Sequence, residues 1–191
     1  LLMHPCIEGE LGGYAGGTGF LVRTELLDQE LFLDFGSVNT VGFYGPEVIS
    51  TLKIRTAKNF CTWVSMYVRQ RGTVFEKGYE LRKYEALRNI KNKIVMGDLN
   101  GSTVYAQPKK TWLQKGLGGE LSAVQSKMHK YGQHLSGLWR SQGMSDISAK
   151  GKYLWAATRT HPNGTKNKLD CVVVTSNVVT DLKAKVIGIK A

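Results

Sequence analysis

The chain has 191 residues, of which 42% are hydrophobic and 9% aromatic. This length suits one domain, and the apolar share excludes a wholly disordered chain. Cys6, Cys61 and Cys171 lie far apart and form no C-x-x-C pair. This excludes a disulfide scaffold and a structural zinc site, and it is typical of a reducing, intracellular compartment. No apolar run approaches the roughly 20 residues that a membrane-spanning helix needs, so we expect no membrane partner.

The formal net charge is +11, and the second half of the chain carries almost all of it. Residues 1–100 contain 12 basic and 11 acidic residues, whereas residues 101–191 contain 14 basic and 4 acidic residues. A one-sided basic field is the expected footprint of a polyanionic partner, above all nucleic acid. A basic protein without such a partner is the alternative interpretation.

The first third of the chain predicts a glycine-rich loop followed by short strands. The glycines in residues 9–19 do not have the spacing of phosphate-binding loops, so they predict tight turns. Alternate positions in residues 60–68 are apolar on both faces, which predicts a strand covered on both sides. The strands expected in this part span residues 20–23, 31–35, 41–44, 48–54 and 60–68.

The rest of the chain predicts a mixture of helices and strands. Apolar residues recur on one side of residues 74–91 and 117–131, which predicts two helices, the second interrupted at Gly132. Pro162-Asn163-Gly164 is a turn signal between two strands. The strands expected here span residues 94–96, 153–160, 168–176 and 182–189. This pattern predicts a layered α+β fold, with a terminal arm over residues 1–11 and one domain over residues 12–191.

The clearest motif for chemistry is Gly97-Asp98-Leu99-Asn100, which follows the short apolar strand at residues 94–96. In extended backbone, positions i and i+2 point the same way, so we expect Asp98 and Asn100 to project together. A carboxylate can help to hold Mg²⁺ or position an attacking water, and an amide can donate to a phosphate oxygen. The pair favours phosphodiester hydrolysis, with an ordinary turn as the alternative.

Four segments in chain order carry a resemblance to a known family. They are Gly16-Gly-Thr-Gly-Phe-Leu-Val22, Trp63-Val-Ser-Met-Tyr-Val68, Ile94–Asn100, and Thr160–Asp170 continuing to Ser176. This series resembles the endonuclease/exonuclease/phosphatase superfamily, most of all the apurinic-type endonuclease domain of non-LTR retrotransposons, over residues 12–180. The resemblance implies a deoxyribonuclease-I-like two-sheet β-sandwich flanked by helices, incomplete at both ends.

The resemblance also implies roles for four residues. Asp98 would orient or deprotonate the nucleophilic water, and it is the candidate metal ligand if the chain is active with Mg²⁺. Asn100 would contact the scissile phosphate, and Tyr67 would lie at the rim of the active site. Asp170 would take the place of the aspartate that orients a catalytic histidine. The alternatives are a core aromatic for Tyr67 and a simple pairing with a lysine for Asp170.

Two parts of the family pattern are missing from this sequence. The family has a metal-binding glutamate before the glycine-rich segment, for which only Glu8 or Glu10 could stand in. It also ends with a Ser-Asp-His segment, and the four histidines of this chain do not replace that histidine. Since losing one member of a catalytic unit costs several powers of ten in rate, whether the chain is an enzyme stays open.

Two functions therefore compete. The first is a Mg²⁺-dependent endonuclease that nicks DNA in the nucleus. The second is an inactive derivative of that fold, which binds RNA or protein in a larger ribonucleoprotein such as a mitochondrial ribosome, with partner proteins covering its open sheet edges. A phosphatase acting on a small substrate is a remote third. For nucleic-acid contacts we expect basic residues and one aromatic residue that could stack on a base: Arg69, Arg71, Lys109, Lys110, Trp112, Lys166 and Lys168.

Overall fold

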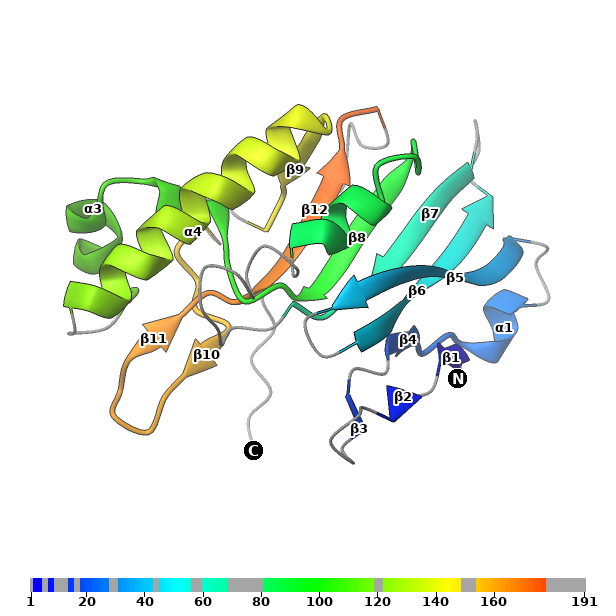
Figure 1. Ribbon diagram of the computed structural model, residues 1–191, viewed down its shortest axis with the longest axis horizontal. Helices are drawn as coiled ribbons and strands as arrows, with labels where there is room; N and C mark the ends of the chain where they lie inside the picture. Colours follow the sequence, from blue (N-terminus) through cyan, green and yellow to red (C-terminus); the bar gives the residue numbers. More distant parts are fainter. Residues whose placement is uncertain are drawn as a thin grey trace. The chain divides into compact units, whose positions relative to one another are not determined.

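The computed structural model describes residues 2–4, 7–8, 14–15, 18–27, 31–42, 45–55, 60–68, 81–118, 122–148 and 154–177 (Figure 1). The chain divides into two compact units, Leu1–Gly97 and Asp98–Ala191. The predicted strand over residues 182–189 and the first part of the predicted helix, residues 74–80, lie outside the described residues. The terminal arm over residues 1–11 and the single domain over residues 12–191 stay predictions.

The first unit is built on strands that are hydrogen-bonded in the order β5, β6, β7 and β8. β5 and β6 form a long antiparallel hairpin, β7 runs antiparallel to β6, and β8 runs parallel to β7. Their bounds are Phe32–Gly42 for β5, Gly45–Arg55 for β6, Phe60–Ser65 for β7 and Lys93–Asp98 for β8. The shorter elements of this unit are β1 (Leu2–His4), β2 (Ile7–Glu8), β3 (Tyr14–Ala15), β4 (Thr18–Phe20) and α1 (Thr24–Leu27).

The strand predictions for this unit hold in part. Residues 60–65 form β7, and Cys61 and Val64, on opposite faces, are 2% and 0% exposed, so both faces are covered as predicted. The three short strands expected over residues 31–54 are instead β5 and β6. The Gly36–Asn39 stretch of β5 suggested a break, but it stays paired residue by residue with β6 because sheet pairing outweighs its weak strand propensity.

Two buried lysines tie a helical turn to the sheet of the first unit. Residues 81–86 are helical. Lys83 forms an ion pair with Glu47 of β6 and donates to the carbonyl of Tyr67, after β7, at 2.9 Å. Lys93 of β8 donates to the carbonyls of Leu87 and Ile90, both at 3.0 Å, where a cation suits the end of a helix. Burial lowers the pKa of Lys93.

The second unit combines helices with two antiparallel strand pairs. β12 pairs with β9, and β10 pairs with β11 in a hairpin that projects from the rest of the unit (Figure 1). The helical elements are η1 (Thr103–Ala106), α3 (Lys109–Gln114) and α4 (Ser122–Ser141). The strands are β9 (Met144–Asp146), β10 (Arg159–Thr160), β11 (Lys166–Asn167) and β12 (Asp170–Thr175).

The core of the second unit centres on Trp112 of α3. Its ring meets that of Tyr105 of η1 edge-on, with centroids 5.2 Å apart, and Val104 and Leu117 complete a fully buried cluster. Such an aromatic pair adds to the stabilisation that burial alone provides. Helices and strands are thus mixed in the chain, which confirms the predicted α+β class. No helix among the described residues is both long and apolar enough to cross a membrane.

The helix predicted over residues 117–131 is placed differently in the structure. α4 covers residues 122–141 and passes through Gly132 without a break, while Leu117 lies before it in the core. A Cβ at position 132 would lie 2.7 Å from Cβ of Tyr105 and 2.8 Å from its carbonyl carbon. Gly132 therefore marks the closest approach of α4 to η1, and not a helix end.

Two glycines of the same helix should respond in opposite ways to alanine. Gly137→Ala should raise the free energy of unfolding by about 0.5–1 kcal/mol, because nothing lies within 4 Å of the added Cβ and alanine favours helix. Gly132→Ala should lower it by about 1–3 kcal/mol, because backbone must move to make room. Urea unfolding of both variants measures this. Equal effects at the two positions would contradict the close packing of α4 on η1.

Candidate functional site

The turn that carries Asp98 starts at a position that requires glycine. Gly97 has a φ of +138°, and a Cβ there would run into the carbonyl oxygen of Met66. The N–H of Met66 donates to the carbonyl of Met96 at 3.0 Å, which holds the two segments together. Only glycine suits both the positive φ and the close approach. The backbone of the first unit therefore sets the residue that precedes Asp98.

Asp98 and Asn100 are joined in a tight turn. The backbone N–H of Asn100 donates to Oδ1 of Asp98 at 3.0 Å. Asn100 has a φ of +47°, a left-handed conformation that asparagine tolerates better than most residues. The predicted extended backbone is therefore wrong at Asn100, and the segment forms the Asx-turn that was the alternative interpretation. This turn leaves Asp98 half-buried and Asn100 buried.

Three hydrogen bonds donated by backbone N–H groups link this turn, Thr158 and the start of β12. The N–H of Leu99 donates to the carbonyl of Leu169 at 3.1 Å. The hydroxyl of Thr158 accepts from the N–H of Leu169 at 2.9 Å and from that of Asp170 at 3.1 Å. Each bond involves a neighbour of a charged residue. Together they gather three charged side chains of the second unit: Asp98, Arg159 and Asp170.

Arg159 is the member of this group that the sequence did not single out. It is exposed and lies on β10, where it pairs with Asn167 of β11. The available signal was its place directly before the Pro162–Gly164 turn. A hairpin at that turn returns the chain toward Asp170, so a basic residue on its first strand comes near that carboxylate. Arg159 gives the group the cation that a phosphate needs.

The environment of Asp98 disfavours its charged form. Burial raises the pKa of its carboxyl, and the negative charge of Asp170 adds to that rise. The N–H of Asn100 and the guanidinium of Arg159 act in the opposite direction, but the pKa stays above its ordinary value. A half-buried carboxylate with a raised pKa is typical of functional positions, because folding alone gains nothing from it.

A second carboxylate of this unit, that of Asp146 at the end of β9, is buried and accepts hydrogen bonds from several side chains. Its Oδ2 accepts from the hydroxyls of Ser102 and Thr103, both at 3.2 Å, and its Oδ1 accepts from that of Ser148. Lys168, which is fully buried, donates its Nζ to the carbonyl of Ser148 at 2.6 Å. Burial lowers the pKa of Lys168, and the charge of Asp146 counteracts this.

Further buried hydrogen bonds hold the chain segments that adjoin Asn100 and Asp170. The hydroxyl of Tyr105 accepts from the N–H of Lys168 at 2.8 Å, and burial raises the pKa of Tyr105 to about 12. The Cys171 thiol donates to the carbonyl of Gly101 at 3.0 Å, and burial raises its pKa well above the ordinary value. These hydrogen bonds therefore hold Gly101, which follows Asn100, and Cys171, which follows Asp170, in place.

Two of the predicted nucleic-acid contacts do not fit the structure. Trp112 is 0% exposed and packs on Tyr105, so its ring is a core group and has no face open to a base. Lys168 is also 0% exposed, and its ammonium group is used within the Asp146 network. The sequence placed both in basic, polar surroundings, but the packing of η1 on α3 and the buried carboxylate turn them inward.

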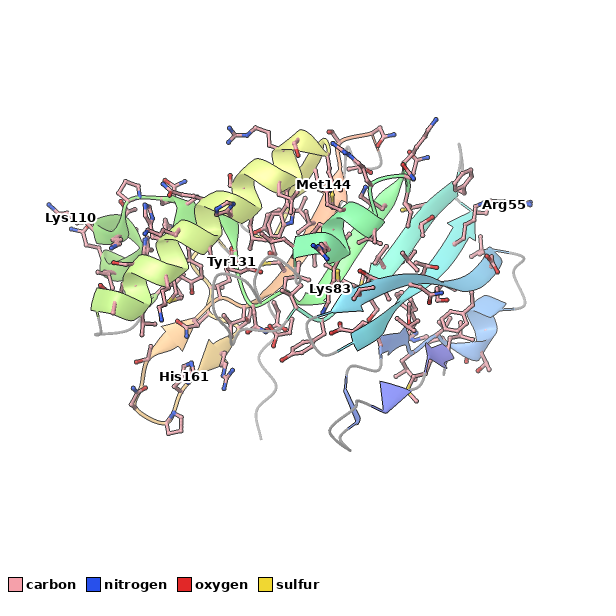
Figure 2. The ribbon with its side chains drawn as sticks, viewed as in Figure 1. Arg55, Lys83, Lys110, Tyr131, Met144 and His161 are labelled. Atoms are coloured by element: carbon pink, nitrogen blue, oxygen red, sulfur yellow. The ribbon has the colours of Figure 1, made fainter. Side chains whose placement is uncertain are left out.

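The other predicted basic contacts are placed as follows. Lys110 is exposed and extends outward from α3 (Figure 2), while Lys109 donates to Ser126 of α4 at 2.7 Å. Lys166 is exposed on β11. Arg69 and Arg71 lie outside the described residues.

The remaining predicted positions belong to the first unit. Tyr67 is 41% exposed, so it is no core aromatic. Its role at an active-site rim stays a prediction. Of the two glutamates that could stand in for a metal ligand, Glu8 lies on β2, and Glu10 lies outside the described residues.

Asp98 and Asp170 form a pair of carboxylates whose charges act on each other. Mg²⁺ is held in proteins through one or two carboxylates, while water and substrate phosphate complete its shell. This pair fits such an ion, because a divalent cation would favour the ionised form of both carboxylates. Within the part of the chain that the structure describes, no three or more His, Cys, Asp or Glu side chains cluster to hold a metal.

Comparisons with known proteins give similarity to solved structures only. No family model matches the chain, and no curated protein matches it. Among solved structures, the chain is similar to the endonuclease domain of TRAS1, a telomere-specific non-LTR retrotransposon, with a TM-score of 0.43 and 16% sequence identity over 75% of this chain. The match spans 65% of that domain's chain. No role for any residue of this chain follows from that similarity.

Asp98→Asn should be more stable than the wild type at pH 7. Because the pKa of Asp98 is raised on folding, its ionised form favours the unfolded chain. That destabilisation is absent below the unfolded pKa of about 4 and grows as pH rises through the folded pKa. Thermal unfolding at several pH values should show a higher Tm for Asp98→Asn at pH 7 and equal values near pH 3.

The matched control for that experiment is Asp34→Asn, which removes an exposed carboxylate on β5. Its Tm should follow the wild type across the same pH range. A Tm for Asp98→Asn below that of the wild type at pH 7 would show that ionised Asp98 stabilises the fold.

Proposed function

We propose that this chain is a Mg²⁺-dependent endonuclease-type phosphodiesterase that nicks DNA, as the resemblance of its sequence motifs to non-LTR retrotransposon endonucleases implies. The observation that carries the proposal is the gathering of Asp98, Asn100, Asp170 and Arg159 by the Asx-turn and the Thr158 hydrogen bonds. Two carboxylates, an amide and a guanidinium at one place match the needs of phosphodiester hydrolysis.

Asp98 is the residue proposed to act on the attacking water. Its Oδ1 is engaged by the N–H of Asn100, and no other hydrogen bond to this carboxylate forms among the described residues. Oδ2 can therefore accept a proton or a hydrogen bond from water.

Asn100 and Arg159 are proposed to bind the phosphate. The left-handed turn fixes the backbone of Asn100, and its side-chain amide is proposed to donate to a phosphate oxygen. Arg159 is exposed and can form paired hydrogen bonds with two phosphate oxygens. Both groups would stabilise the charge that grows on the phosphate in the transition state.

Mg²⁺ would be held by the carboxylates of Asp98 and Asp170. When bound, it would supply positive charge to the phosphate oxygens and to the leaving oxygen. The substrate is proposed to be a polymer because residues 101–191 carry 14 basic and 4 acidic residues, an extended field that exceeds what a small phosphorylated molecule needs.

Nicking of supercoiled plasmid tests this function. The wild type should nick with Mg²⁺ and not with EDTA, and Asp98→Ala should lose the activity. Arg159→Ala should lower kcat by about 10²–10³-fold, the usual cost of removing one group that stabilises transition-state charge, and Arg159→Lys should restore part of it. Arg55→Ala, which removes an exposed arginine at the end of β6 (Figure 2), should nick at the wild-type rate.

Two results would contradict the proposal. Asp98→Ala that nicks as fast as the wild type would show that another group or a contaminant is responsible. A wild type that binds DNA or RNA in a salt-sensitive way, yet nicks nothing, would favour the inactive nucleic-acid-binding derivative of this fold.

A further inference from the structure

The inner face of α4 is fully used in packing. Gly132 lies against Tyr105, and Leu135 and Trp139 are 0% and 1% exposed. A Cβ on Gly101 would run into the side chains of Leu135 and Tyr131, so this face covers the residues that directly follow Asn100. The opposite face of α4 therefore points away from the Asp98 turn.

That opposite face carries a line of basic residues, here called the α4 stripe: Lys127, Lys130 and His134. All three are exposed, and their spacing of three and four residues places them on one side of the helix. At about 1.5 Å per residue, the stripe is roughly 10 Å long. Ala123, Gly137 and Ser141, which continue the same line, are small and exposed, so nothing bulky flanks the stripe.

The positive charges of the α4 stripe do not stabilise the helix that carries them. Neither α3 nor α4 contains an aspartate or a glutamate. The first turn of α4 therefore has no acidic residue to match the helix dipole, and Lys127 and Lys130 repel each other at i, i+3. Neither lysine forms an ion pair or a hydrogen bond within the described part of the chain. A surface that costs helix stability and finds no counter-charge among the described residues suits an anionic partner.

We infer that the α4 stripe binds the sugar–phosphate backbone of duplex DNA, as a surface separate from the Asp98 turn. The exposed residues of α4 include no Phe, Tyr or Trp, whereas proteins that hold single strands stack bases on aromatic rings. The two lysine cations, in line along the helix with His134, match the regular phosphates of a duplex, which carry one charge per about 1.7 Å of axis. The choice of DNA rests on the proposed function.

Because its face is opposite to the one that covers the residues after Asn100, the stripe would hold a DNA segment other than the phosphate at Asp98. Its contacts would carry no sequence information, since they reach only the backbone. The stripe would thus raise affinity for long duplexes without taking part in the cleavage step.

Fluorescence anisotropy with a labelled blunt duplex, in EDTA to prevent cleavage, tests this inference. The neutralised variant is Lys127→Gln/Lys130→Gln. The matched control is Arg55→Gln/Lys91→Gln, which removes the same charge from two exposed positions of the first unit. Circular dichroism and Tm of both variants establish that they fold.

The neutralised variant should bind the duplex on the order of tenfold more weakly at 50 mM salt, and its slope of log K against log salt should be smaller by about 2. The control variant should lose much less affinity for the duplex. Equal losses in the two variants would overturn the inference, and so would a loss seen for a single-stranded oligonucleotide and not for the duplex. Because the assay needs no cleavage, weak binding by the neutralised variant supports the stripe even where the wild type nicks nothing.

Discussion

The second unit depends on one buried carboxylate. Asp146 would be costly to bury alone, but the hydroxyls of Ser102, Thr103 and Ser148 and the nearby charge of Lys168 compensate it. Ser102 lies two residues after Asn100, and Lys168 lies two residues before Asp170. The interactions that satisfy Asp146 therefore fix both segments that carry the proposed site. The hydrogen bonds that stabilise the buried Asp146 are thus the same ones that position the residues of the proposed site.

Local patterns predicted the parts of the fold that local physics decides. β7 and β8 follow from continuous apolar residues, and the hairpin turn at residues 162–164 follows from its Pro-Asn-Gly sequence. Gly132 is a residue whose role local sequence patterns do not predict. In the sequence it is a helix breaker, but in the structure it lets α4 approach Tyr105, a partner that is 27 positions away and that no local pattern reveals.

In the candidate site, too, local sequence predicted some features and distant contacts decided the others. The turn at Asp98 and Asn100 was open to prediction as the alternative to extended backbone, because an Asx-turn is local. For Arg159 the turn at residues 162–164 was the only local signal, and its place beside Asp98 depends on hydrogen bonds of Thr158 and Leu169 that form in the tertiary structure. Lys168 and Trp112 were placed on the surface by their charged neighbours, but a distant carboxylate and a distant ring bury them. The positive φ values of Gly97 and Asn100 and the raised pKa of Asp98 fall within four consecutive residues, a concentration of unfavourable local features that is typical of functional sites.

Hydrogen exchange in Asp146→Ala, followed by mass spectrometry, tests most directly whether the buried carboxylate holds the site. We expect Asp146→Ala to lower the free energy of unfolding by about 3 kcal/mol, and residues 98–106 to lose more protection than residues 60–68. Asp34→Ala, which removes an exposed carboxylate of β5, should leave both unchanged. Full protection of residues 98–106 in Asp146→Ala would contradict the account, because the turn at Asp98 would then be held by other interactions.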